Sequence, residues 1–137
     1  MDTKFLIDSY QQLKSIRQNW ENHWQECADY TLPRRADVTK RRSRGDKRFE
    51  LVFDSTAIHA AELLASSLHG MLTNAASPWF HLRFKDEAIN DNDEAKEWLE
   101  SSSQAMYQAF ARSNFQQEVH ELYLDLVVFG TGSMLIE

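Results

Sequence analysis

The first thirty residues carry the longest regular pattern in the chain and limit what it can fold into. Apolar or small side chains recur there at steps of three and four, at Leu6, Tyr10, Leu13, Ile16, Trp20, Trp24, Cys27 and Thr31. This spacing puts them on one face of an α-helix. We predict a helix over residues 4–31, about seven turns long and ended by Pro33, with Trp20 and Trp24 facing a core.

A second helix is predicted near residues 55–74. Asp54 or Ser55 offers a side-chain oxygen to its first free backbone amides. Its apolar stripe includes Leu68, which we expect to be a core residue, and its many alanines allow other helices to come close.

Helical spacing also predicts a third helix near residues 93–112 and a fourth near residues 115–129. Asn114 and Gln117 have the spacing of a capping box at the start of the fourth helix. Its carboxylates, Glu118, Glu121 and Asp125, are expected on the solvated face opposite the apolar stripe. Gly130 and Gly132 are expected to end this helix in the left-handed backbone conformation.

Two short stretches show strand character. In residues 79–84 Trp79, His81 and Arg83 alternate with Phe80, Leu82 and Phe84, and residues 133–136 read as a last apolar strand. The predicted fold class is therefore α+β, mainly α, with about four helices and a small sheet in a single domain over residues 1–137. Since two strands alone are marginal, we expect the chain to be the N-terminal part of a longer protein.

Residues with catalytic or metal-binding chemistry are sparse. His23 and Cys27 lie one helical turn apart, but a closed zinc site needs two further ligands. The run Gly130-Thr131-Gly132-Ser133 lacks the lysine of a phosphate-binding loop and precedes a strand instead of a helix. There is no G-x-S-x-G nucleophile motif. We expect no enzymatic activity, no catalytic residue, no metal and no cofactor.

Charge is distributed very unevenly. Residues 32–48 hold eight Lys or Arg against two Asp, a local charge of +6, and since the whole chain carries −6, the remainder carries −12. A single cysteine, Cys27, excludes an internal disulfide and fits a reducing compartment, and no apolar run is long enough to span a membrane.

The basic loop, residues 33–48, is expected to project from the helical body as a solvated arm. Its cations are the candidate partner or DNA contacts: Arg34, Arg35, Lys40, Arg41, Arg42, Arg44, Lys47 and Arg48. They suit phosphate groups, but no aromatic side chain lies between them to stack on bases. Three interpretations stay open: nonspecific nucleic-acid binding, binding to an acidic protein surface that includes a neighbouring copy, or a solvated loop without a partner.

The order of several short motifs resembles one family. These are Trp20-x3-Trp24, Tyr30-Thr31-Leu32-Pro33-Arg34, Phe53-Asp54-Ser55-Thr56-Ala57, Leu72-Thr73-Asn74, Ser77-Pro78-Trp79-Phe80-x-Leu82, Trp98-Leu99, Ser113-Asn114-Phe115 and Phe129-Gly130-Thr131-Gly132. Together they resemble the N-terminal region of the head-to-tail connecting (portal) proteins of short-tailed bacteriophages. The resemblance covers nearly the whole chain.

The resemblance implies the wing-like part of a structural subunit in a twelve-membered ring at one capsid vertex. It further implies synthesis in the bacterial host cytoplasm, and nonspecific passage of double-stranded DNA during packaging and ejection. The implied partners are further copies of the subunit and the capsid, scaffold, terminase and tail proteins, without a membrane. The alternative function is a free-standing nucleic-acid-binding or adaptor module that uses residues 34–48.

Overall fold

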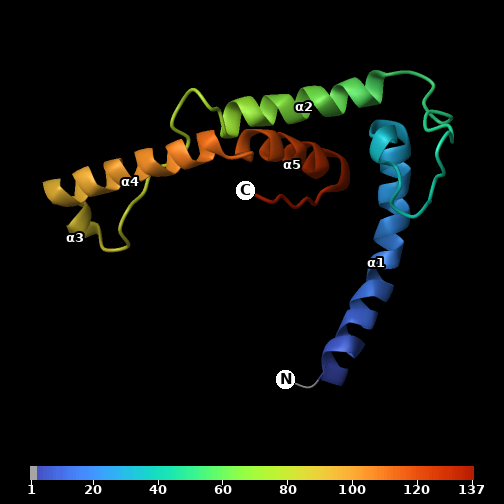
Figure 1. Ribbon diagram of the computed structural model, residues 1–137, viewed down its shortest axis with the longest axis horizontal. Helices are drawn as coiled ribbons and strands as arrows, with labels where there is room; N and C mark the ends of the chain where they lie inside the picture. The colour runs from blue at the N-terminus through green and yellow to red at the C-terminus, as the bar shows by residue number, and fades with distance from the viewer. Residues whose placement is uncertain (1–2) are drawn as a thin grey trace. The chain divides into compact units, whose positions relative to one another are not determined.

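The computed structural model describes residues 3–137, and its regular secondary structure is entirely helical (Figure 1). The long helices are α1 (Thr3–Thr31), α2 (Thr56–Leu72), α4 (Asp93–Arg112) and α5 (Phe115–Phe129). Two short elements join them, the 3₁₀ turn η1 (Pro33–Arg35) and the single-turn helix α3 (Glu87–Asn90). The four predicted helices are confirmed, and the short helix α3 was not among them.

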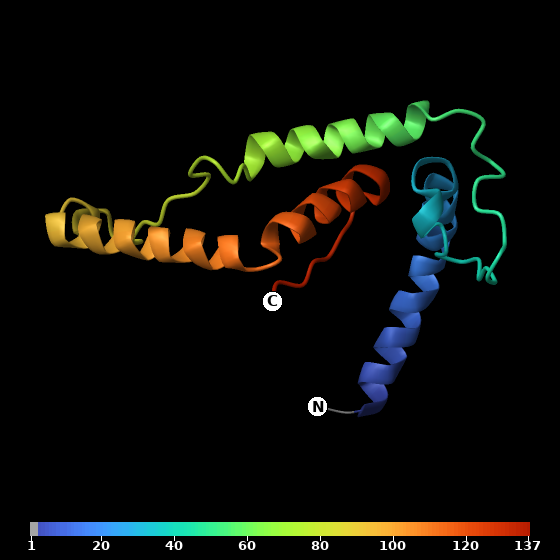
Figure 2. The same ribbon diagram turned by 45° about the horizontal axis from the view of Figure 1, so that its top comes forward.

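The predicted sheet is wrong, and with it the α+β fold class, because residues 3–137 form no strand (Figure 2). Residues 79–84 instead run as an irregular segment whose backbone is bound by side chains. The Tyr107 hydroxyl accepts hydrogen bonds from the backbone N–H groups of Trp79 at 2.9 Å and Phe80 at 2.8 Å, and it donates to the Phe80 carbonyl at 2.7 Å. The alternation in residues 79–84 was therefore wrongly taken for a strand. The Tyr107 hydroxyl, and not a second strand, binds the backbone of Trp79 and Phe80.

The second expected strand, residues 133–136, is also irregular. The Asn114 side chain donates to the Leu135 carbonyl at 3.1 Å and accepts from the Glu137 N–H at 2.9 Å. This use of the Asn114 amide overturns the predicted side-chain capping box. The Ser113 hydroxyl accepts from the Phe115 N–H at 3.1 Å and so serves the start of α5.

Contacts within the chain divide it into two compact units. Unit 1 holds the residues up to Glu62 together with Val127–Gly130. Its buried apolar residues are small, apart from Leu32: Ala28, Ala36 and Ala61. The indole N–H of Trp24 donates to the Phe129 carbonyl at 3.0 Å, which ties the two sequence segments of this unit together.

Unit 2 holds Leu63–Leu126 and Thr131–Glu137. Here α5 lies beside the C-terminal part of α2, and His69 pairs with the Gln116 side chain at 2.8 Å. The most buried aromatic ring is Phe115, which stacks on Trp79 with 5.8 Å between ring centroids and packs on Phe110 at 4.6 Å. The centre of this unit therefore combines an aromatic cluster around Phe115 with the buried aliphatic residues Ala65, Val119 and Leu124.

Several predicted faces are less buried than expected. Trp20 is 59% exposed, so its assignment to the core is wrong, while Trp24 and Leu68 are half-buried. Conversely, Glu118 and Asp125 are only partly exposed, although both were expected on a solvated face. The periodicity located the helices correctly, but periodicity alone does not show which part of an apolar face is covered.

Most of the apolar face of α1 is open in the structure. We call Leu6, Tyr10, Leu13, Ile16 and Trp20 the α1 stripe; their exposed fractions run from 47% to 67%. Burial begins only near the end of the helix, at Gln25, Ala28 and Asp29. Gln25 and Asp29 contact the basic loop, which is why that end of α1 positions the candidate site.

Candidate interaction surface at the basic loop

The backbone of the basic loop is fixed to α1 by one buried side chain. Gln25, only 4% exposed, donates from its amide nitrogen to the Ala36 carbonyl at 2.8 Å. Its amide oxygen accepts from the backbone N–H groups of Thr39 at 2.9 Å and Lys40 at 3.2 Å. The expectation of a free, projecting arm is therefore wrong for the part of the loop around residues 36–40.

One helical turn further along α1, Asp29 forms ion pairs with two cations of the loop. Its carboxylate lies 2.9 Å from Nη2 of Arg42 and 2.7 Å from Nζ of Lys40, and it also accepts from the Gln25 amide at 3.0 Å. Burial alone would raise the pKa of this carboxyl, but the hydrogen bonds from Lys40, Arg42 and Gln25 outweigh it and hold the pKa below its ordinary value. Asp29 is thus an anionic anchor for the loop.

A second carboxylate, Asp37, completes the bracing from within the loop. It lies 3.2 Å from Nη1 of Arg42 and 2.8 Å from Nη2 of Arg48. Arg48 also donates to the Arg34 carbonyl at 3.0 Å. The hydrogen bond to Asp29, followed by that to Asp37, raises the pKa of Arg42 above its ordinary value. Arg42 therefore joins both carboxylates and is the centre of this network.

The predicted contact residues fall into two groups. Lys40, Arg42 and Arg48 hold the loop in place. Four others are exposed and form no ion pair with any residue in the described range 3–137: Arg34, Arg41, Arg44 and Lys47. We call these four the outward cations. The remaining candidate, Arg35, is also exposed.

A tight turn presents Arg44. The Asp46 carboxylate accepts from the Ser43 N–H at 2.6 Å, and Gly45 takes a φ of +93°, a backbone conformation that glycine adopts without side-chain strain. Exposed apolar side chains follow the loop directly: Phe49 at 54%, Leu51 at 41% and Phe53 at 92%. The surface therefore combines positive charge with apolar area.

Sequence reasoning missed the residues that organise this surface. Gln25 and Asp29 were overlooked because they are polar residues beside an apolar stripe, a position usually taken for the solvated edge of a helix. Their one-turn separation, so close before a loop with eight cations, was the available signal.

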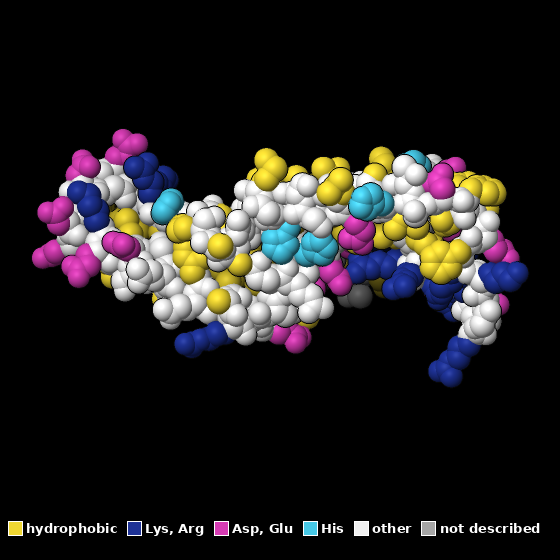
Figure 3. Space-filling view, turned by 90° about the horizontal axis from the view of Figure 1, so that it is seen from above, with side chains coloured by type: hydrophobic (Ala, Val, Ile, Leu, Met, Phe, Trp, Pro, Cys, Tyr) yellow, Lys and Arg dark blue, Asp and Glu magenta, His cyan; other side chains and the backbone are white. Residues whose placement is uncertain are grey.

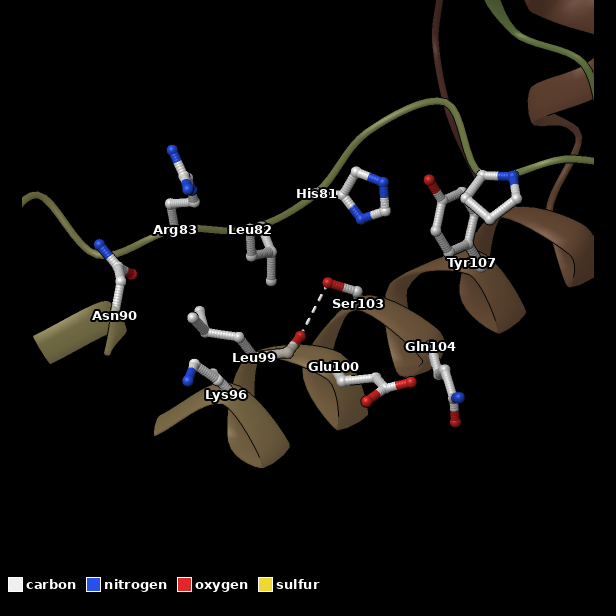
Figure 4. Close-up of a pocket in the computed structure, with 11 residues that line it drawn as sticks. His81, Leu82, Arg83, Asn90, Lys96, Leu99, Glu100, Ser103, Gln104 and Tyr107 are labelled. Atoms are coloured by element: carbon white, nitrogen blue, oxygen red, sulfur yellow. Dashed lines mark hydrogen bonds between the residues drawn. The ribbon is translucent and has the colours of Figure 1, made fainter. Parts of the chain in front are cut away.

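The chain has another hollow, in unit 2, between residues 78–83 and α4 (Figure 4). Its volume is about 520 Å³, and cations such as Arg83 and Lys96 share its rim with Glu100. The Ser103 hydroxyl in its wall donates to the Leu99 carbonyl at 2.7 Å and is committed to its own helix. Mixed charges around a hollow of this kind point to no particular reaction.

Metal-binding groups do not converge within residues 3–137: no cluster of three or more His, Cys, Asp or Glu side chains there is arranged to hold an ion. His23 and Cys27 lie 3.7 Å apart, as their spacing suggested, and no third metal-binding side chain of the described part of the chain joins them. None of the described helices combines the length and the apolar character needed to cross a membrane.

Comparison with known proteins identifies the family. The family model described as bacteriophage head to tail connecting protein matches residues 3–137. A probable portal protein of Bordetella phage BPP-1 is 33% identical over 136 residues, which is 98% of this chain and 24% of that protein. A portal protein of Salmonella phage epsilon15 is 33% identical over 132 residues, 96% of this chain and 24% of that protein.

The chain thus spans about a quarter of the length of these two relatives. The match extends over α1, the basic loop and all the helices that follow, so it does not rest on one motif. The family resemblance predicted from the sequence is confirmed: this chain belongs to the bacteriophage head-to-tail connecting protein family.

Proposed function

We propose that this chain is a structural region of a portal subunit, which forms a ring at one vertex of the phage capsid. The observation that carries the proposal is the family match over residues 3–137, together with two relatives named as portal proteins. In this role the chain is a noncatalytic scaffold of a virion component, and residues 1–137 belong to the N-terminal, wing-like part of the subunit.

The amount of exposed surface supports a role in a larger assembly. The chain exposes 10886 Å² for a mass of 16.0 kDa. Folded monomers of that mass expose about 7,400 Å², and even two separate domains of half the mass would expose about 8,900 Å² together. The α1 stripe accounts for part of the excess. Apolar area of this extent is usually covered by other protein.

The whole subunit is proposed to act as the passage through which double-stranded DNA is packaged and ejected. Its proposed partners are further copies of itself, twelve in the ring, and the capsid, scaffold, terminase and tail proteins. It would be made in the host cytoplasm before it enters the virion. The eight candidate cations, Arg34 to Arg48, are proposed to meet one of these partners; the outward cations are the members with charge available for it.

A stop codon within residues 3–137 of the phage gene tests the proposal. The expected result in a nonpermissive host is capsids without packaged DNA and without attached tails, seen by electron microscopy, and recovery when the intact gene is supplied in trans. The matched control is a synonymous change at the same codon. DNA-filled, tailed particles formed without the intact chain would refute the connector function and favour a separate adaptor role.

A further inference from the structure

We propose that the basic loop binds the acidic segment 86–100 of a second copy of this chain. The inference rests on the proposed connector function, because it names the contact by which neighbouring subunits recognise each other. It starts from the outward cations, which form no ion pair within residues 3–137, in a loop that contacts with α1 fix in place.

The acidic segment offers complementary charge. Residues 86–100 contain one lysine and seven carboxylates: Asp86, Glu87, Asp91, Asp93, Glu94, Glu97 and Glu100. All seven residues are exposed, and Figure 3 shows acidic side chains gathered around this end of α4. The local charge is −6, equal and opposite to the +6 of residues 32–48.

Both surfaces also carry apolar side chains that a contact would cover. Trp98 is 59% exposed and Ile89 is 44% exposed within the acidic segment, and Phe49 and Leu51 stand exposed beside the loop. Exposed aromatic residues among opposite charges are typical of protein interfaces, in which apolar anchors supply affinity and surrounding charges supply selectivity.

The topology makes the contact head to tail. The loop belongs to unit 1 and the acidic segment to unit 2, so each copy has one basic and one acidic surface. Two different surfaces that bind each other produce a heterologous interface, and such interfaces generate rings when the rotation closes. This geometry suits a subunit that repeats around an axis.

A nucleic acid is the less favoured occupant of the loop. Asp29 and Asp37 already form ion pairs with Lys40, Arg42 and Arg48. The chain as a whole carries −6, which repels a polyanion beyond the immediate contact. The apolar side chains beside the loop also find no partner on a phosphate backbone.

Charge reversal tests the contact directly. One variant combines Arg41→Glu, Arg44→Glu and Lys47→Glu; the other combines Asp91→Lys, Glu97→Lys and Glu100→Lys. None of these six side chains takes part in the Gln25, Asp29 and Asp37 network. Self-association of each variant and of their equimolar mixture is measured by sedimentation velocity at about 50 mM salt, where exposed charges are weakly screened. Circular dichroism checks that each variant stays helical.

Each variant alone is expected to associate at least about tenfold more weakly than the unaltered chain, and the mixture is expected to recover most of that loss. The mixture recovers because reversed loops then meet reversed acidic segments on other copies. The control variant, Lys14→Glu with Arg112→Glu, changes exposed cations elsewhere and should associate like the unaltered chain.

Other results would overturn the proposal. If association recovers in a single chain that carries all six changes but not in the mixture, the contact is internal to one copy. If the loop variant alone loses duplex DNA binding and the mixture does not recover association, the occupant is nucleic acid. If particles that carry either reversed surface package DNA normally, this contact is refuted and the connector function stands. If instead the mixture recovers association but the stop codon causes no packaging defect, the connector function is refuted.

Discussion

Asp29 and Arg42 form an ion pair of 2.9 Å across thirteen residues of sequence, and this contact fixes the basic loop to the end of α1. The side chain of Asp29 is 5% exposed and that of Arg42 is 15% exposed. Three of the loop's cations, Lys40, Arg42 and Arg48, therefore hold its structure, and the four outward cations do not.

Replacement of the anchor should loosen the loop. Asp29→Asn removes the charge that faces Lys40 and Arg42, and we expect unit 1 to lose about 1.5–3 kcal/mol, the range for hydrogen bonds to charged groups. Urea unfolding measures the loss, and hydrogen exchange at the Thr39 and Lys40 amides locates it. The exposed neighbour Glu26 provides the control, since Glu26→Gln should change stability by about 0.5 kcal/mol or less. Equal effects of the two substitutions would contradict the anchoring role.

The anchor also predicts acid sensitivity. The pKa of Asp29 in the folded chain lies below its unfolded value of about 3.9, so the anionic form stabilises the fold. This contribution is fully present above about pH 4 and is lost as the pH falls through the folded pKa. The protection of the Thr39 amide against exchange, relative to its intrinsic rate at each pH, should fall over that range in the unaltered chain. The Asp29→Asn variant should show no such step, and a step of equal size in both would assign it to another group.

The helices were predictable from sequence because their signals are local. The start of α2 follows from a short side chain, since Asp54 Oδ1 accepts from the Thr56 N–H at 2.8 Å and this hydrogen bond lowers the pKa of the Asp54 carboxyl. The left-handed Gly130, with φ of +71°, ends α5 as expected. Each of these features depends on residues within one helical turn of each other.

The strands and the basic arm were not predictable because nonlocal contacts decide them. Residues 79–84 alternate like a strand, yet Tyr107 in α4 binds the backbone of Trp79 and Phe80. The loop looks fully solvated by composition, yet Gln25 and Asp29 bind it from the preceding helix. In both cases one or two polar side chains bind several groups that are distant in sequence, and such pairings cannot be seen in residue composition or spacing.

Removal of the Tyr107 hydroxyl tests this account of residues 79–84. Tyr107→Phe leaves the ring but strips the partner from two backbone N–H groups and one carbonyl. We expect unit 2 to lose about 1–3 kcal/mol, the cost of unsatisfied partly buried polar groups, with faster exchange at the Trp79 and Phe80 amides. Tyr10, which is 64% exposed, serves as the control because Tyr10→Phe should be nearly neutral. If exchange at the Trp79 and Phe80 amides is unchanged in Tyr107→Phe, the proposed role of the hydroxyl is contradicted.

Gly132 was expected to be needed for a left-handed backbone, but its φ is not in that region. Space is the reason for glycine there: a Cβ would stand 2.8 Å from Leu122 Cδ1 and 3.2 Å from Asp125 Cβ. Gly132→Ala should therefore cost about 1 kcal/mol or more through overpacking. Gly70→Ala meets open space in α2 and should stabilise that helix by about 0.5–1 kcal/mol. Thermal unfolding compares the two, and the same sign for both would contradict the packing argument.

The exposed α1 stripe is expected to matter for assembly and not for the stability of the isolated chain. Leu13 and Ile16 are each 67% exposed, so Leu13→Gln with Ile16→Gln should change the stability of the isolated chain by about 0.5 kcal/mol or less. In the proposed connector these side chains are covered by other protein, and the same pair of changes should reduce incorporation of the subunit into particles. Gln12→Ala with Asn19→Ala alters exposed polar residues of the same helix and is the matched control. Thermal unfolding of the chain and quantification of the subunit in purified particles measure the two effects. If the stripe variant enters particles as efficiently as the control, α1 stays open to solvent there, and the exposed area must be covered elsewhere.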